Sequence, residues 1–88
     1  MKKLKSVLAE RLSAYVELRQ RLGLKFAEPA DIIEKFDRYL FERGHSGLLT
    51  QEVAIDFATQ EPDASRSQCA RRYQVVRIFS EYLARRPA

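Results

Sequence analysis

The first part of the chain repeats its apolar residues with the period of an α-helix. Over residues 3–22 these side chains recur every three or four positions and share one helical face: Leu4, Leu8, Leu12, Tyr15, Leu18 and Leu22. Gly23 is able to adopt the left-handed backbone that closes a helix. The pattern predicts an amphipathic helix that stops at Gly23, followed by the short connection Leu24-Lys25-Phe26, whose apolar members dock.

A second helix is predicted to begin at Pro29, because proline suits the first helical turn, where its missing N–H is not needed. Its expected buried face consists of Ile32, Ile33, Phe36, Tyr39 and Leu40. The sequence Glu42-Arg43-Gly44 places a cation in the last turn and a glycine just beyond it, which favours a helix end there. The residues His45-Ser46-Gly47 are expected to continue as a turn.

A third, shorter helix is predicted after Thr50, whose hydroxyl can accept a hydrogen bond from a free backbone N–H, with Glu52 in the first turn. Its inward residues are Val53, Ala54, Phe57 and Ala58. Glu61-Pro62-Asp63 should break this helix. Ser65 followed by Gln68 has the form of a capping box, which predicts a fourth helix that runs to about Ala84.

The fourth helix has an apolar side and a basic side. Its apolar side chains are Val75, Val76, Ile78, Phe79, Tyr82 and Leu83, and the opposite side carries Arg66, Tyr73, Gln74, Arg77 and Arg85. Arg72 is the exception, because it projects into the apolar arc. A guanidinium there needs a carboxylate or carbonyl partner to avoid a costly desolvated charge.

These elements predict an all-α fold of four helices in one domain that spans residues 1–88. The sequence lacks period-two alternation, β-branched runs and hairpin turns, so it predicts no strand. Eighty-eight residues are enough for one small domain and leave no room for a second.

Charge is unevenly distributed along the chain, whose formal net charge is +4. Residues 1–24 carry six basic and two acidic side chains, residues 25–63 carry four and nine, and residues 64–88 carry six and one. Two basic ends therefore flank an acidic middle. Such segregation suits a protein that offers its ends to a polyanion.

The sequence shows no catalytic or metal-binding motif, and we expect no enzyme, cofactor, metal site or small-molecule substrate. A nucleophile with its base, paired carboxylates and a phosphate-binding loop are all missing. His45 is interpreted as an exposed turn residue and Cys69 as a small packing residue. One cysteine and one histidine are too few for a zinc site, and a lone cysteine forms no intrachain disulfide.

No apolar run approaches the roughly 18 to 20 residues that a bilayer crossing needs. The basic start MKKLKSVLAE is soon interrupted by Glu10 and Arg11, unlike the apolar region of a signal peptide. We therefore expect a cytoplasmic protein without a membrane partner.

Four segments together resemble a known domain family. The runs YVELRQRLGLKF (15–26), FDRYLFERG (36–44), LTQEVAIDFA (49–58) and ARRYQVVRIFSEYLARRP (70–87) are similar, in order and spacing, to the N-terminal core-binding domain of tyrosine recombinases and phage-type integrases. The resemblance implies an all-α, SAM-like orthogonal four-helix bundle. It also implies binding to double-stranded DNA as half of a clamp, in DNA recombination or integration.

In that family the catalytic residues belong to a C-terminal domain that this chain does not contain, so the resemblance implies a non-catalytic module. The tyrosines Tyr15, Tyr39, Tyr73 and Tyr82 are accordingly assigned to helix packing or helix surface. The parent protein would break and rejoin DNA. We expect a monomer in isolation, with any oligomer on DNA involving the parent catalytic domain.

The family contacts DNA with its second and fourth helices. Carried over to matching positions, this implies six DNA-binding residues: Lys25, Arg66, Ser67, Arg71, Gln74 and Arg77. The cations would mostly hold phosphates, and Gln74 or Arg71 would reach base edges. An ordinary solvated helix face is the alternative interpretation of each.

Two departures from the family pattern bear on this transfer. Asp31 and Glu34 add negative charge to the second helix, and Gln68 and Cys69 stand where the relatives often have aromatic residues. A helical protein–protein interaction module is the alternative function, since SAM-like bundles often bind partners through their helix ends.

Overall fold

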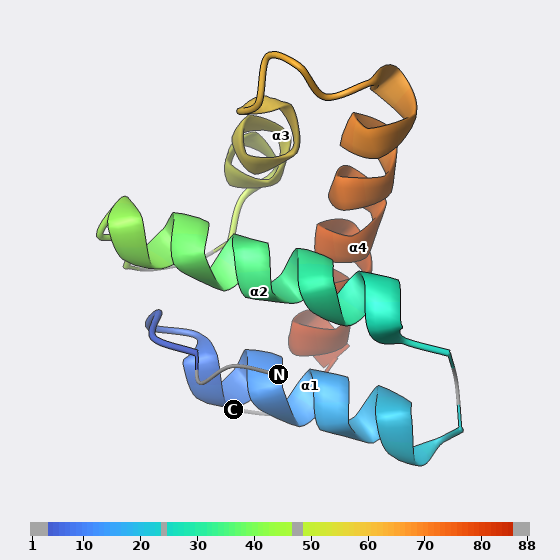
Figure 1. The fold of residues 1–88 in the computed structure, drawn as a ribbon. Helices are drawn as coiled ribbons and strands as arrows, with labels where there is room; N and C mark the ends of the chain where they lie inside the picture. Colours follow the sequence, from blue (N-terminus) through green and yellow to red (C-terminus); the bar gives the residue numbers. More distant parts are fainter. Residues whose placement is uncertain (1–3, 24, 47–48, 86–88) are drawn as a thin grey trace. The chain divides into compact units, whose positions relative to one another are not determined.

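A computed structural model describes residues 4–23, 25–46 and 49–85, and within these ranges it contains four α-helices and no strand (Figure 1). The predicted all-α class is confirmed. The chain separates into two compact units, Met1–Ser46 and Gly47–Ala88. Each unit contains two helices that are neighbours in sequence.

The first unit pairs α1 (Ala9–Arg21) with α2 (Ala27–Glu42). The two helices lie side by side and run in opposite directions (Figure 1). The ring of Phe26, in the connection between them, meets the ring of Tyr15 edge-on, with centroids 5.7 Å apart. The predicted docking of Phe26 is thereby confirmed, and Leu24 lies outside the described residues.

The start of α1 and its last apolar positions differ from the prediction. The helix begins at Ala9 instead of near residue 3, because the segment before it has other hydrogen-bond partners. The Asp37 carboxylate accepts the backbone N–H of Lys5 at 2.8 Å and that of Ser6 at 2.9 Å. Leu18 and Leu22 are exposed, the latter by 62%, so they do not extend the buried face.

The five residues predicted for the buried face of α2 are all buried: Ile32, Ile33, Phe36, Tyr39 and Leu40. The helix begins at Ala27, two residues before Pro29, where a proline still removes no intrahelical hydrogen bond. Gly44 takes the left-handed conformation, with φ +61°, and His45 N–H donates to the Leu40 carbonyl at 2.9 Å. Arg43 lies just beyond the last turn, and its guanidinium covers the Tyr39 ring.

The second unit pairs α3 (Gln51–Thr59) with α4 (Arg66–Arg85). In Figure 1, α3 is seen nearly end-on beside α4. Both predicted caps are present: Thr50 Oγ1 accepts the Val53 N–H at 3.2 Å, and Ser65 and Gln68 exchange hydrogen bonds of 3.1 and 2.9 Å. The two helices contribute buried apolar residues to this unit: Ala54, Phe57, Ala58, Val75, Val76 and Phe79.

Other predicted core positions of this unit are half-buried: Val53, Ile78, Tyr82 and Leu83. Arg72 is buried, as predicted, with 8% of its surface exposed. Its Nη2 lies 3.3 Å from a carboxylate oxygen of Glu61, in the segment between the two helices. Its buried Nη1 has no hydrogen-bond partner among the described residues.

Candidate functional site

One side of α4 carries five of the six predicted site residues, and we call this surface the α4 face: Arg66, Ser67, Arg71, Gln74 and Arg77. At 3.6 residues per turn they span about 140° of the helix circumference. All are exposed except Arg71, which is half-buried. The helix thus presents three cations along one side, opposite its buried Val75, Val76 and Phe79.

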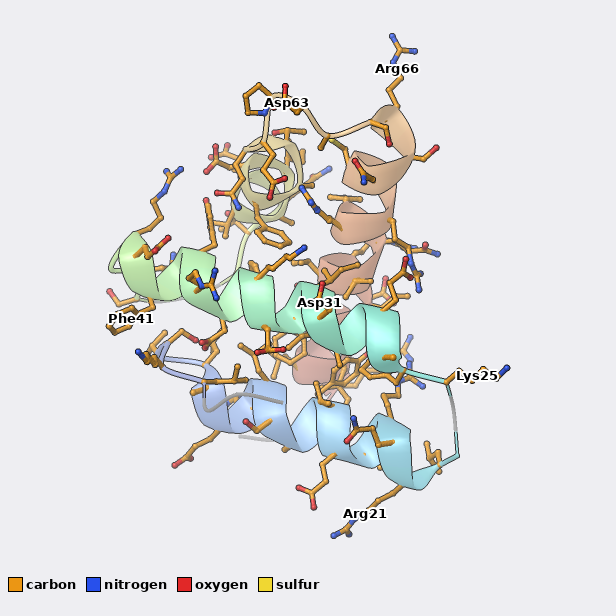
Figure 2. All side chains as sticks on the ribbon, viewed as in Figure 1. Arg21, Lys25, Asp31, Phe41, Asp63 and Arg66 are labelled. Carbon is orange, nitrogen blue, oxygen red and sulfur yellow. The ribbon has the colours of Figure 1, made fainter. Side chains whose placement is uncertain are left out.

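The sixth residue, Lys25, belongs to the other unit. It is exposed and lies immediately before Phe26, the residue that precedes α2 (Figure 2). Asp31 follows within α2 and forms an ion pair with Lys35 at 3.3 Å. Five of the six predicted residues therefore lie on a single helix, where they form the α4 face.

The first turn of α4 carries a positive charge, which is unfavourable for the stability of the helix. Arg66 is its first residue, its side chain points outward (Figure 2), and no acidic residue lies in that turn. A cation at the positive end of the helix dipole is unfavourable. The capping box between Ser65 and Gln68 satisfies two backbone N–H groups and offsets part of this cost.

The other two arginines of the α4 face have neighbours on the same helix. Arg77 Nη1 lies 3.1 Å from a Glu81 carboxylate oxygen, and their side chains are 54% and 48% exposed. Arg71 Nη1 donates to Gln74 Oε1 over 3.4 Å. The Arg77–Glu81 ion pair is exposed, and such pairs one helical turn apart contribute only about 0.3–0.5 kcal/mol, so an incoming anion competes with Glu81 for Arg77 at low cost.

A groove of about 390 Å³ lies between the start of α3 and the later turns of α4, and we call it the α3–α4 groove. Thr50, the N-cap of α3, and Gln51, its first residue, line one side. The residues that line the other side belong to α4: Tyr73, Arg77, Ser80 and Glu81. The sequence patterns indicate neither Gln51 nor Tyr73 as a residue of this wall. Tyr73 was placed on the polar side of its helix, but no local signal shows that α3 begins beside it.

A second cavity, of about 350 Å³, lies in the first unit at the end of α2. Lys5 and Arg38 line it together with Glu34, Asp37 and Glu42. Its charges are mixed, and both Asp37 oxygens already accept backbone N–H groups. This arrangement anchors the segment before α1 and offers no basic surface.

His45 and Cys69 carry the other side chains with candidate chemistry. His45 is half-buried instead of exposed, and its N–H helps to close α2. Cys69 is half-buried as well. Across the described ranges no three His, Cys, Asp or Glu residues gather as metal ligands. In the same ranges no helix combines the length and the apolar character needed to cross a membrane.

The chain is similar to part of one curated protein. A protein of Sinorhizobium fredii (strain NBRC 101917 / NGR234), named "Putative integrase/recombinase y4rE", is 35% identical to it over 77 residues, which make up 88% of this chain. The chain spans about a quarter of that relative's length, 24%. No protein-family model matches the chain, and no solved structure matches it significantly. The similarity therefore connects this helical chain to a stretch of a protein with an integrase/recombinase name.

Proposed function

We propose that the chain binds double-stranded DNA as the non-catalytic N-terminal clamp domain of a tyrosine recombinase or integrase. The observation that carries this proposal is the α4 face, where Arg66, Arg71 and Arg77 lie along one exposed side of a single helix. The relative's integrase/recombinase name and the order of the four helices support the same function.

Helix geometry supplies the mechanism. A major groove about 12 Å wide admits an α-helix, and arginine side chains on that helix neutralise phosphates and release counterions. Arg66 and Arg77, at the two ends of the α4 face, would contact the backbone. Gln74 and Arg71, between them, would read base edges.

In this proposal three of the tyrosines, Tyr15, Tyr39 and Tyr82, serve packing and not chemistry. The Tyr15 ring contacts Phe26, the Tyr39 ring stacks on Phe36 and the Tyr82 ring stacks on Phe79, with centroids 5.7 to 6.3 Å apart. Strand cleavage and rejoining would belong to the rest of the parent protein.

A fluorescence-anisotropy titration with a labelled duplex at 50 and 200 mM salt tests the proposal. The wild-type chain is expected to bind at low salt and to weaken steeply at high salt. The double variant Arg71→Ala/Arg77→Ala should lose about tenfold or more in affinity, and its slope of log K against log salt should fall by about 1 to 2.

The matched control is Arg11→Ala/Arg21→Ala, which removes the same charge from the exposed side of α1. It should change the affinity far less than the α4 variant. A wild-type chain that does not bind duplex DNA at low salt would refute the function. Binding with little salt dependence would favour a protein-interaction module, and equal losses in both double variants would remove the α4 face from the interface.

A further inference from the structure

We propose that the α3–α4 groove seats one strand of the DNA backbone, with a phosphodiester held between Gln51 and Tyr73 on its walls and Arg77 at its side. This inference rests on the proposed function and extends the interface from one helix to two. Its starting point is the cavity itself, which places polar side chains of both helices around a space of about 390 Å³.

The groove has the size that this ligand needs. Pockets for small ligands begin at about 300 Å³, so the volume is sufficient for a phosphodiester with part of an adjoining sugar. Leu49, Ala54 and Ala84 supply apolar surface on the walls. Such surface suits the sugar, while the polar side chains suit the phosphate.

The groove also has hydrogen-bond donors that the fold does not use. Neither the Tyr73 hydroxyl nor the Gln51 amide has a hydrogen-bond partner within residues 4–23, 25–46 and 49–85. Thr50 Oγ1 accepts the Val53 N–H, which leaves the hydroxyl hydrogen of Thr50 as a further donor. Donors from two helices thus converge on one space.

Without DNA, the partner of Arg77 in the groove is Glu81. Its carboxylate holds Arg77 at 3.1 Å along the groove wall, where both side chains are about half exposed. A phosphate oxygen would replace that carboxylate as the partner of Arg77. Because exposed ion pairs of this kind are weak, breaking this one is expected to cost little, and the Glu81 carboxylate would then have to turn away from the phosphate, which carries the same sign of charge.

Two variants that add the same charge at different places test this phosphodiester site in the same duplex titration. Gln51→Glu adds a negative charge inside the groove, whereas Gln60→Glu adds the same charge at the other end of α3, where Gln60 is exposed. At low salt Gln51→Glu should weaken duplex binding roughly threefold or more, and Gln60→Glu by less than about 1.5-fold. Circular dichroism and thermal melting should show that both variants fold as the wild type does.

A neutral variant provides a second measurement. Tyr73→Phe removes only the hydroxyl and should weaken binding about twofold to threefold without changing the salt slope, because no charge is lost. The proposed phosphodiester site is refuted if Gln51→Glu and Gln60→Glu bind the duplex alike, or if Tyr73→Phe binds it as tightly as the wild type. In either case a loss in Arg71→Ala/Arg77→Ala would leave the proposed function standing, whereas a wild-type chain that does not bind DNA would end both.

Discussion

For Arg72 the sequence predicts the buried position correctly but does not identify the ion-pair partner. Its position among apolar neighbours follows from helical periodicity, and the structure buries it. Its partner is Glu61, which lies 11 positions earlier and was recognised only as part of a helix-breaking segment. One guanidinium nitrogen, Nη1, is buried and has no partner in the described residues, so the ion pair compensates only part of the desolvation.

This asymmetry predicts unequal effects of removing the two partners. Arg72→Met replaces the buried guanidinium with an apolar chain and should leave the free energy of unfolding within about 1 kcal/mol of the wild type. Glu61→Ala leaves the buried cation uncompensated and should lower the free energy of unfolding by about 1–2 kcal/mol. This loss is smaller than for a fully buried pair, because the Glu61 side chain is half exposed and water screens its charge. Urea denaturation followed by circular dichroism measures both. A larger loss for Arg72→Met than for Glu61→Ala would contradict this account.

At the scale of the helices, local signals predicted the starts of α3 and α4, and distant contacts decided the start of α1. Thr50, Ser65 and Gln68 cap their own helices through neighbours three residues away, so the sequence alone reveals them. The partner that withdraws Lys5 and Ser6 from a helix is Asp37, more than 30 residues away. No short-range pattern contains that information.

The first turn of α4 predicts opposite effects on stability and on DNA affinity. Arg66→Glu replaces a cation at the positive helix end with an anion and should raise the free energy of unfolding by about 0.5–1 kcal/mol at low ionic strength. It should weaken duplex binding at the same time, because it reverses a charge of the α4 face. Thermal melting measures the expected gain in stability, and anisotropy titration of the same preparation measures the expected loss of duplex affinity.

An Arg66→Ala variant serves as the control for that prediction, since it removes the cation without adding an anion. It should fall between the wild type and Arg66→Glu in both measurements. Lower stability of Arg66→Glu would refute the dipole argument, and unchanged affinity would exclude Arg66 from the interface.

Asp37 provides a test of how the segment before α1 is held on α2. Asp37→Asn keeps the shape but offers one acceptor oxygen to two backbone N–H groups, and should lower the free energy of unfolding by about 1–3 kcal/mol. Asp31→Asn on the same helix is the matched control. It breaks only an exposed ion pair with Lys35 and should cost less than about 0.5 kcal/mol. Chemical denaturation distinguishes the two, and equal losses would contradict the anchoring role.

At the scale of the whole molecule, each compact unit contains one of the two basic ends of the sequence: residues 1–24 in one and residues 64–88 in the other. The helices and most of their buried faces follow from periodicity, whereas the exposure of Leu22 and the existence of the α3–α4 groove depend on how helices pack. The six DNA-binding residues stay a prediction from the family resemblance. The structure adds to it the arrangement in which five of them share one side of α4.

The pairing of helices that are neighbours in sequence also bears on how quickly the chain reaches its native state. When α1 closes on α2, or α3 on α4, the residues that meet are separated by short stretches of chain. Little loop entropy is lost before such contacts form, and helical proteins with mostly local contacts fold in roughly microseconds to milliseconds. Rapid folding leaves little time in which partly folded chains can associate through exposed apolar surface.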